Sequence, residues 1–372
     1  MPTTTTAAVL EAPGQPFAFH QVELDDLRAD EVLVRMVAAG LCHTDLSVQA
    51  GHIPFPLPGV IGHEGAGVVE AVGSAVTRVA PGDSVALSFT SCGRCGQCRG
   101  GHPAYCATWL PANIFNNGTR ADGSATLRRG GTVLGGRFFG QSSLSAKAVV
   151  DERSVVKVGS DLPLHLVAPL GCGIQTGAGT VLNVLRPEPG STLAVFGTGA
   201  VGLAAIAAAA LTPLSAVIAV DLVDHRLDVA LGLGATHRVN AGTEDIAKAL
   251  AGITDGAGLD YAIDTTANMS VLRTAVDALG TLGRAAAIGA TTPGTELALD
   301  YQGLLVGRSI VGVTEGDADP ESLIPLLAGL YRQDRLPLDA IVRTYPFSEI
   351  NQAVADARDG TAIKPVLLFD AV

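Results

Sequence analysis

The sequence contains few aromatic residues and little charge. Of its 372 residues only 4% are aromatic and 16% are charged, whereas 48% are hydrophobic. This composition argues against intrinsic disorder, which requires low hydrophobicity and high charge. With so few aromatic rings, the core must consist mainly of Val, Leu, Ile and Ala side chains, and the 45 glycines indicate many tight turns. Both features favour an α/β protein.

A basic cluster and a targeting segment are also absent from the sequence. The chain carries 24 basic and 36 acidic residues, a formal charge of −12, and no Lys/Arg cluster that could follow a phosphate backbone. We therefore expect no nucleic-acid partner. The first residues, MPTTTTAAVLEAPG, lack the basic and apolar regions of a secretion signal, so we expect a cytoplasmic protein.

One uncharged stretch, Leu193–Val220, is long enough to span a bilayer. Glycines and Pro213 interrupt it, however, and Asp221 ends it. The buried strands of a parallel sheet also form near-continuous apolar runs. We interpret the stretch as part of such a sheet and expect no contact with a membrane.

The length of the chain predicts two domains, since domains usually contain about 100–200 residues. Up to about residue 150, short β-like runs alternate with Gly and Pro, namely Glu31–Val37, Ala66–Val72 and Asp83–Leu87. Between residues 193 and 313, apolar strands alternate with helix-like runs, which predicts a doubly wound parallel sheet.

The last part of the chain alternates again. We expect a helix at Glu321–Tyr331, a short strand at Ile341–Pro346, a second helix and the terminal strand KPVLLF, all returning to the first domain. Within that domain the segment Ala112–Gly136 is rich in Gly, Asn and Arg. It is expected to form a long surface loop, and loops of this length are often functional.

Four of the six cysteines form the pattern CxxCxxCx7C, at Cys92, Cys95, Cys98 and Cys106. Four thiolates at this spacing can complete a tetrahedron around Zn2+, which needs no further ligand at a structural site. Two disulfides are disfavoured without a secretion signal, and an iron–sulfur cluster is an alternative. A zinc ribbon that binds nucleic acid would need the basic surface that this chain lacks.

The other two cysteines lie far apart, Cys42 in GLCHTD and Cys172 in GCGIQTGAG, with His63 in GHEGAG between them. Singly, each could be an ordinary core residue. Together, two thiolates and an imidazole form a known ligand set for catalytic zinc, which leaves a fourth position for a substrate oxygen. Asp45 or Glu64 could orient the imidazole, since a metal-bound His usually donates its second N–H to a carboxylate or carbonyl.

A dinucleotide fingerprint occurs in VFGTGAVG, where Gly197, Gly199 and Gly202 form GxGxxG between an apolar strand and an Ala-rich helix. The amides of Thr198–Val201 could meet a pyrophosphate at the start of that helix. The next strand ends in Asp221, where an acid binds ribose hydroxyls and repels the 2′-phosphate of NADP. The pattern predicts NAD as cofactor; the alternative is a turn without a ligand.

With these motifs in place, the sequence resembles the zinc-containing alcohol dehydrogenases of the medium-chain dehydrogenase/reductase superfamily over nearly its whole length. The resemblance rests on GLCHTD, GHEGAG, the four-cysteine loop, GCGIQTGAG, GTGAVG with Asp221, and the basic residue of AIKPVLLF. Two segments, FFGQSSLSAKAVV and NNGTRADGS, more narrowly resemble the aryl-alcohol (benzyl alcohol) and geraniol dehydrogenase branch.

The resemblance implies a GroES-like catalytic domain from residues 1–173 and 317–372 and a Rossmann NAD-binding domain from residues 174–316, with the active site in the cleft. It implies two zinc ions per subunit and hydride transfer between NAD and a primary, aromatic or allylic alcohol or aldehyde. It also implies a homodimer or homotetramer in which the last Rossmann strand, around Ser309–Val313, pairs across subunits.

Individual residues receive expected roles from the same resemblance. His43 and Lys364 are expected near the cofactor phosphates. Arg226 is expected near the adenosine ribose, beside Asp221. Thr176 and Val201 are expected behind the nicotinamide ring.

The proton is expected to leave through Thr44, two residues after Cys42, and to pass to the cofactor ribose while zinc acts as a Lewis acid on the alcohol oxygen. Many relatives continue this relay with a histidine where this sequence has Ser47. Water or His52 could complete the route, and the sequence leaves both open.

Substrate contacts are harder to predict than metal ligands. Four residues near the matched motifs are candidates for the pocket walls, although each could equally serve packing: Trp109, Leu110, Phe115 and Ile288. Two other readings stay open. One is a zinc dehydrogenase that acts on polyols or on a thiol adduct of formaldehyde, and the other is a catalytically silent protein that binds zinc and NAD.

Overall fold

The computed structural model describes residues 3–292 and 294–370. The chain divides into two compact units. Unit 1 consists of Met1–Cys172, Asp319–Gly329 and Val342–Val372, and unit 2 consists of Gly173–Ala318 and Leu330–Ile341. Unit 1 is therefore assembled from segments that precede and follow unit 2 in the chain.

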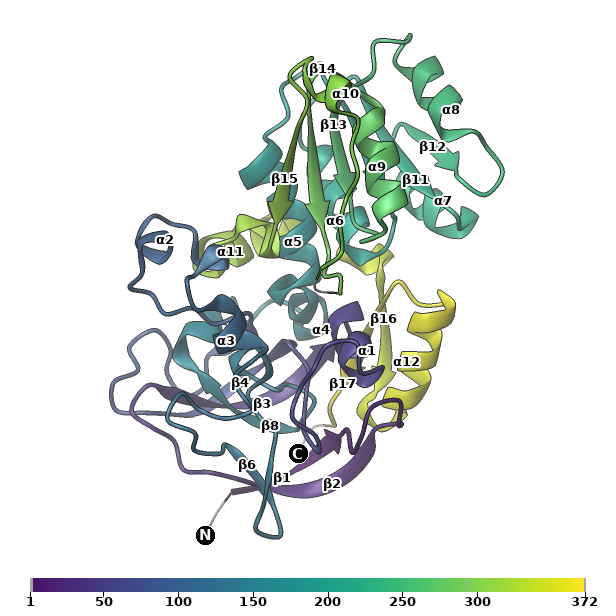
Figure 1. The fold of residues 1–372 in the computed structure, drawn as a ribbon. Helices are drawn as coiled ribbons and strands as arrows, with labels where there is room; N and C mark the ends of the chain where they lie inside the picture. Colours follow the sequence, from purple (N-terminus) through teal and green to yellow (C-terminus); the bar gives the residue numbers. More distant parts are fainter. Residues whose placement is uncertain (1–2, 293, 371–372) are drawn as a thin grey trace. The chain divides into compact units, whose positions relative to one another are not determined.

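Unit 1 is built on two β-sheets (Figure 1). One has the strand order β1-β2-β6-β7, and the other the order β16-β17-β3-β4-β5-β9, with β8 also pairing with β3. These pairs are antiparallel except for β16 with β17. The strands are β1 Thr3–Val9, β2 Ala18–Leu24, β3 Glu31–Gly40, β4 Glu64–Val72, β5 Ser84–Leu87, β6 Leu127–Arg129, β7 Thr132–Leu134, β8 Lys147–Asp151, β9 Val155–Lys157, β16 Val342–Pro346 and β17 Lys364–Leu368.

The strands expected near residues 31, 66 and 83 are confirmed as β3, β4 and β5. Because alternate side chains of a strand point to opposite faces, Val32, Val34 and Met36 of β3 lie on one face. They are buried in one apolar cluster with Val69 of β4 and Val85 of β5. This packing of aliphatic side chains explains how unit 1 forms a core with few aromatic rings.

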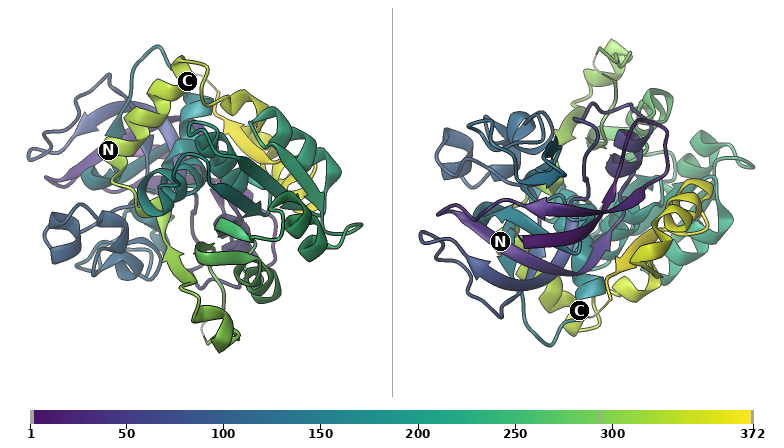
Figure 2. Two further views of the ribbon diagram at one scale, coloured as in Figure 1. Left: turned by 90° about the horizontal axis from the view of Figure 1, so that it is seen from above. Right: turned by 90° about the horizontal axis from the view of Figure 1, so that it is seen from below.

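Short helices and one longer pair complete unit 1. The helix α12 lies beside β16 and β17, as the yellow elements of Figure 1 and Figure 2 show. The predicted helix at 321–331 and strand at 341–346 are confirmed within one residue as α11 and β16, and α11 belongs partly to each unit. The helices are α1 His43–Gln49, α2 Gly96–Arg99, α3 Trp109–Asn113, α4 Leu164–Val167, α11 Pro320–Arg332 and α12 Ile350–Asp359.

The prediction of a long surface loop at Ala112–Gly136 is wrong in part. The segment contains the hairpin of β6 and β7, and β6 pairs with β2. Its Arg120 is only 4% exposed and donates from Nε and Nη2 to the two carboxylate oxygens of Glu31, at 2.7 and 2.8 Å. Arg137 donates to the same carboxylate at 2.9 Å. No motif in the sequence indicates this contact between Arg120 and Glu31, because the two residues are 89 positions apart.

Unit 2 contains a six-stranded sheet with the order β12-β11-β10-β13-β14-β15, and all its pairs are parallel. This is the doubly wound order in which dinucleotides bind beyond the carboxyl ends of the central strands. The strands are β10 Thr192–Phe196, β11 Ala216–Asp221, β12 His237–Asn240, β13 Leu259–Asp264, β14 Leu279–Ile288 and β15 Ser309–Val313. The helices are α5 Gly173–Gly179, α6 Ala200–Ala209, α7 Asp224–Gly232, α8 Ile246–Ile253, α9 Met269–Asp277 and α10 Tyr301–Leu304.

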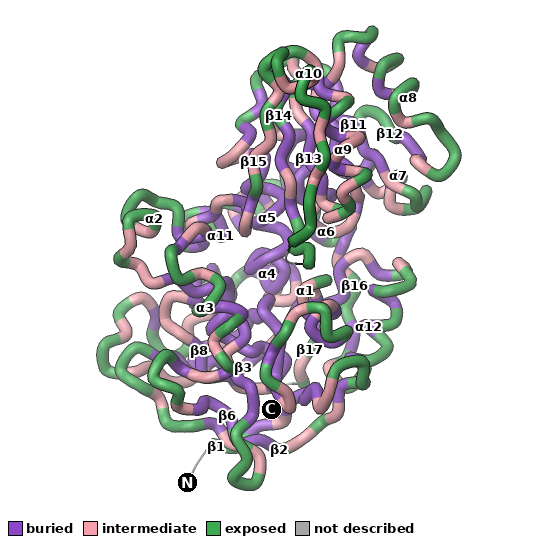
Figure 3. The backbone as a smooth tube through the Cα atoms, viewed as in Figure 1, coloured by how far each residue is buried: buried purple, intermediate pink, exposed green. Residues whose placement is uncertain are grey.

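Helices of unit 2 pack against the sheet through apolar side chains. Ala194 and Phe196 of β10 share a buried cluster with Leu250 of α8 and Leu272 of α9. Figure 3 shows mostly buried residues along β11 and β13 and residues of mixed burial on α8. The uncharged stretch from residue 193 to 220 forms β10, α6 and most of β11, as expected for a buried parallel sheet. Among residues 3–292 and 294–370, no helix has the length and apolar character that crossing a membrane requires.

The buried pair of Glu31 and Arg120 predicts an acid-sensitive contribution to stability. Burial alone would raise the pKa of Glu31, but hydrogen bonds and charge from Arg120, with further help from Arg28 and Arg137, lower it. A carboxyl group whose pKa falls on folding stabilises the fold above its unfolded pKa, and this contribution is lost as pH falls through the folded value. Glu31→Gln should cost about 3 kcal/mol at neutral pH, because it leaves buried charge unpaired.

The measurement is the free energy of unfolding in urea as a function of pH. The difference between wild type and Glu31→Gln should be constant near neutral pH and shrink below the ordinary glutamate pKa of 4.5. Glu70→Gln is the matched control, since Glu70 is 28% exposed and binds Lys147, and it should cost less than about 1 kcal/mol. Equal costs for both variants would contradict the anchoring role of Glu31.

Candidate functional site

The structure brings Cys42, His63 and Cys172 together in unit 1. Their potential ligand atoms, with a carboxylate oxygen of Glu64, all lie within 4.8 Å of one another. Cys42 precedes α1, His63 precedes β4, and Cys172 ends the segment before α5. The hydroxyl of Ser88, after β5, donates to the Gly171 carbonyl at 2.7 Å and so fixes the segment that carries Cys172.

Asp45, rather than Glu64, orients the imidazole of His63. Its Oδ1 lies 3.0 Å from His63 Nδ1 and accepts from the Gly62 amide at 3.2 Å, and its Oδ2 accepts from the Cys42 amide at 3.0 Å. All three hydrogen bonds are possible only if Nδ1 carries the proton. The lone pair is then on Nε2, which is buried and has no hydrogen-bond partner. Such an atom beside two thiols fits a metal ion.

Glu64 is paired with Lys364 of β17. Lys364 Nζ lies 2.8 and 2.9 Å from the two carboxylate oxygens and donates to the Leu41 carbonyl at 3.1 Å. Gly40 makes room for the carboxylate, since a Cβ there would lie 2.0 Å from Glu64 Oε2. Lys364 is only 2% exposed. Its role at the cofactor phosphates therefore stays a prediction, while its contact with Glu64 is direct.

Electrostatics favour a thiolate at Cys42. A hydrogen bond from Cys172 lowers the pKa of Cys42 well below its usual range against the effect of burial, and the charges of Lys364 and His63 add to this. Burial alone would lower the pKa of His63, but Asp45 raises it well above its ordinary value. A proton and a metal ion compete for the same atoms here, so metal affinity should fall with falling pH.

Aromatic side chains, scarce in the chain as a whole, gather around His63. The Phe139 ring stacks on the imidazole with centroids 4.5 Å apart, and Phe138 meets it edge-on at 5.5 Å. Trp109 contacts Phe139 edge-on at 5.5 Å, and its Nε1 is buried without a hydrogen-bond partner. Phe139 adopts φ +52°, which is unusual for a bulky residue and indicates local strain at the site.

The four remaining cysteines form a second group in unit 1, with sulfur atoms all within 4.8 Å of one another. Backbone amides donate to three of the sulfurs, and Cys92 Sγ lies 4.0 Å from Cys98 Sγ. Zinc–sulfur bonds of 2.3 Å at tetrahedral angles place sulfurs about 3.8 Å apart, so the group fits zinc. All six cysteines are free thiols, which rules out the disulfide alternative.

The dinucleotide fingerprint lies at the carboxyl end of β10 in unit 2. Gly197 has φ +88°, and a Cβ at Gly202 would lie 1.9 Å from the Gly197 carbonyl oxygen. No atom lies within 4 Å of the corresponding Cβ position at Gly199, which precedes α6 and provides no side-chain cap. The first amides of α6 are thus accessible to an anion, as a pyrophosphate site requires.

Asp221 ends β11 beside this loop and accepts four hydrogen bonds. Thr198 donates to Oδ2 from its amide at 2.6 Å and from its hydroxyl at 2.8 Å. Leu222 and Val223 donate their amides to Oδ1 at 2.7 and 3.0 Å. Arg226 lies in α7, and its Nε is buried with no hydrogen-bond partner. The contact of the Thr198 hydroxyl with Asp221 was not predicted, although Thr198 belongs to the motif VFGTGAVG.

The other predicted residues fall in both units. In unit 1, Thr44 Oγ1 lies 3.9 Å from Cys42 Sγ and His43 is exposed. In unit 2, Thr176 donates to Glu315 Oε2 at 3.4 Å and Val201 is half-buried at the start of α6. Their roles toward the cofactor and the proton stay predictions.

Of the predicted pocket walls, Trp109 is the one that reaches the aromatic cluster around His63. Phe115 is 50% exposed and lines a separate cavity of about 840 Å3 beside the four-cysteine loop, and Leu110 is 49% exposed. Ile288 is buried at the end of β14 in unit 2. Phe138 and Phe139 were not predicted as site residues, although both belong to the segment FFGQSSLSAKAVV.

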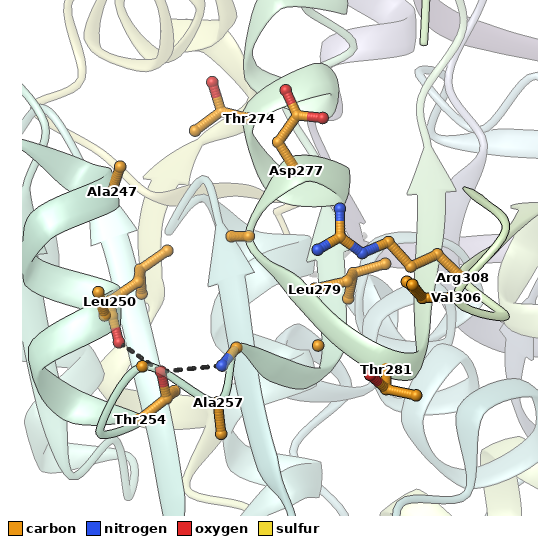
Figure 4. A pocket seen from close by; sticks show the side chains of 15 residues that line it. Ala247, Leu250, Thr254, Ala257, Thr274, Asp277, Leu279, Thr281, Val306 and Arg308 are labelled. Atoms are coloured by element: carbon orange, nitrogen blue, oxygen red, sulfur yellow. Dashed lines mark hydrogen bonds between the residues drawn. The ribbon is translucent and has the colours of Figure 1, made fainter. Parts of the chain in front are cut away.

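A further cavity of about 550 Å3 in unit 2 contains none of the predicted residues (Figure 4). It lies between the ends of α8 and α9 and the beginning of β14, at the amino ends of the strands. Dinucleotides bind at the opposite edge of such a sheet. We therefore do not assign the cofactor to this cavity.

Two catalogued families describe the chain. Residues 28–160 match the alcohol dehydrogenase GroES-like domain, and residues 200–329 match the zinc-binding dehydrogenase family. The chain is 42% identical to a geraniol dehydrogenase from Castellaniella defragrans over 98% of its own length and 97% of the relative.

Solved structures agree with this. An alcohol dehydrogenase zinc-binding domain protein from Burkholderia ambifaria is 46% identical, with a TM-score of 0.97 and complete coverage of both chains. A benzyl alcohol dehydrogenase from Acinetobacter calcoaceticus is 43% identical, with a TM-score of 0.95, and the alignment covers 99% of this chain and 100% of that one.

A GroES-like unit and a parallel doubly wound unit together define a medium-chain dehydrogenase. The chain belongs to the zinc-containing alcohol dehydrogenase family of this superfamily. The predictions of family, fold class and enzyme class are therefore confirmed.

The two ligand groups predict two zinc ions per chain. Cys172→Ser should reduce the content to one ion by removing a ligand of the first group, and Cys95→Ser should do the same for the second. Inductively coupled plasma mass spectrometry of purified protein measures this. Ser47→Ala, a change in α1 that removes no ligand, should retain both ions. Iron with visible absorption would instead indicate an iron–sulfur cluster and contradict the zinc assignment.

Proposed function

We propose that the protein interconverts a primary aromatic or allylic alcohol and its aldehyde with NAD, using Cys42, His63 and Cys172 as ligands of a catalytic zinc. The observation that carries the proposal is the convergence of these three side chains with the unpartnered Nε2 of His63. When bound, zinc supplies a Lewis acid that stabilises negative charge on the alcohol oxygen, and NAD accepts the hydride.

Other residues of the chain position the ligands and transfer the proton. Asp45 holds the imidazole so that Nε2 faces the two thiols, and Lys364 neutralises the buried Glu64 beside them. Thr44, whose hydroxyl lies 3.9 Å from Cys42 Sγ, accepts the proton of the substrate hydroxyl and passes it on. Cys92, Cys95, Cys98 and Cys106 hold a structural zinc that fixes their loop.

NAD binding is supported by unit 2. Its strand order, the open position at Gly199 and the carboxylate of Asp221 form the elements that a dinucleotide site needs. An acid at the end of the second strand favours NAD over NADP. We propose that unit 1 corresponds to the catalytic domain and unit 2 to the cofactor domain, with the predicted limits near residues 173 and 317.

The substrate class is supported by the aromatic cluster and by two relatives. Trp109 is half-buried and packs edge-on against the buried Phe139, which stacks on His63, so Trp109 offers flat apolar surface to a flat apolar alcohol. The relatives at 42% and 43% identity are named for geraniol and benzyl alcohol.

The first test is an assay of the zinc-loaded protein with NAD+. Benzyl alcohol and geraniol should give higher kcat/KM than ethanol or sorbitol. Cys172→Ala should abolish turnover, because it removes a ligand of the proposed catalytic ion. Turnover retained by this variant would overturn the ligand assignment, and no activity with any aromatic or allylic alcohol would remove the substrate class.

A second test addresses the contribution of the aromatic side chains near His63 to substrate preference. Phe139→Leu keeps apolar volume but loses the ring that packs against Trp109 and His63, so the ratio of kcat/KM for benzyl alcohol over ethanol should fall about three- to tenfold. Phe347→Leu is the matched control, because Phe347 stacks on Phe369 in another part of unit 1. An unchanged ratio in Phe139→Leu would place the substrate elsewhere.

We also propose a homodimer that pairs along β15. Among the residues that the structure describes, only β14 pairs with β15, which leaves the outer edge of β15 open. Tyr301 is 71% exposed and Leu305 61% exposed, and Figure 2 shows their segment projecting from unit 2. An exposed apolar patch beside an open strand edge is typical of an association surface.

The double variant Tyr301→Lys with Leu305→Lys should shift the mass in solution from dimer or tetramer toward monomer. Light scattering after size-exclusion chromatography measures this, and thermal unfolding reports whether the fold survives. Leu326→Lys is the control, since Leu326 is also an apolar side chain, 52% exposed, and lies on α11 in unit 1. A wild-type protein that is monomeric would contradict the proposed pairing.

A further inference from the structure

The carboxylate of Asp221 is held on both sides by its own chain. Two donors reach Oδ2 and two reach Oδ1, at distances between 2.6 and 3.0 Å. Hydrogen bonds to a charged group are stronger than those between neutral groups. The fold itself therefore fixes the position and orientation of this negative charge.

One of the four donors depends on the identity of a side chain. The other three are backbone amides, of Thr198, Leu222 and Val223, which any residue except proline would supply. The fourth is the hydroxyl of Thr198, which donates to Oδ2 at 2.8 Å. Thr198 is fully buried, so its hydroxyl has no access to water as an alternative partner.

Thr198 also stands between the first two glycines of the fingerprint. Its amide and hydroxyl connect the loop after β10 to the end of β11. The loop expected to meet the pyrophosphate and the acid expected to meet the ribose are thus joined through one residue. A ligand that contacts both must find them in a fixed relation.

We propose that Thr198 is a positioning residue that determines how strongly this chain prefers NAD over NADP. The inference rests on the proposed function, in which Asp221 binds the adenosine ribose. A carboxylate held by Thr198 stays where it accepts hydrogen bonds from ribose hydroxyls and repels a 2′-phosphate. Without the hydroxyl, Oδ2 keeps a single donor, and the carboxylate can turn away from the phosphate.

The test is the binding of NADH and NADPH to the intact zinc-loaded protein, measured by cofactor fluorescence. Thr198→Val removes the hydroxyl with little change of size. The ratio of Kd for NADPH to Kd for NADH should fall about tenfold relative to wild type, because one hydrogen bond to a charged group is lost.

Two further variants distinguish the effect of the Thr198 hydroxyl from an effect of altered packing. Thr198→Ser keeps the hydroxyl and should restore most of the wild-type ratio. Thr254→Val is the matched control from the cavity in Figure 4, where Thr254 is 8% exposed, donates to the Leu250 carbonyl and accepts from the Gly258 amide. It removes a buried, hydrogen-bonded hydroxyl from the same unit and should leave the ratio unchanged.

An unchanged ratio in Thr198→Val, with a wild-type unfolding temperature, would overturn the proposal. Tighter NADH binding in that variant would also overturn it, because the hydroxyl would then compete with the ribose for Asp221. If Thr198→Val does not fold, Thr198→Ala gives the same reading. A wild-type protein without preference for NADH would instead refute the NAD assignment within the proposed function, and with it this inference.

Discussion

The hydrogen bond between Asp45 and His63 is the interaction on which the proposed metal site depends. Asp45 is fully buried and also accepts from the amides of Cys42 and Gly62, so one carboxylate fixes the start of α1, the approach to β4 and the imidazole between them. Burying a charge is tolerated only when it is paired and fully hydrogen-bonded. The three hydrogen bonds that compensate for burying the Asp45 carboxylate therefore also hold the side chains of the site in place.

The sequence was informative where function depends on short motifs. GLCHTD, GHEGAG and GCGIQTGAG contain the three side chains that converge, and the fingerprint with Asp221 lies where a doubly wound sheet places it. The sequence could not decide between Asp45 and Glu64 as the orienting acid, because each is close in sequence to a ligand. The choice depends on Lys364, which reaches Glu64 across 300 positions of chain.

Long-range side-chain contacts explain the other omissions. Arg120 lies in a Gly- and Asn-rich segment, so its sequence neighbours suggest a surface residue. They do not indicate its partner, Glu31, which lies 89 residues earlier. Phe139 was not singled out because stacking on His63 needs a left-handed backbone, which is rare for aromatic residues and has no clear sequence signature. Periodicity predicts which residues are buried, but not which distant groups they meet.

The placement of Lys364 has a consequence for synthesis on the ribosome. β16 and β17 follow unit 2 in the chain but pair within the sheet of unit 1. Until they emerge, Ala38–Gly40 of β3 cannot pair with β17, and Lys364 cannot contact the carboxylate of Glu64. The surroundings of the proposed metal ligands are therefore complete only once β17 has been translated.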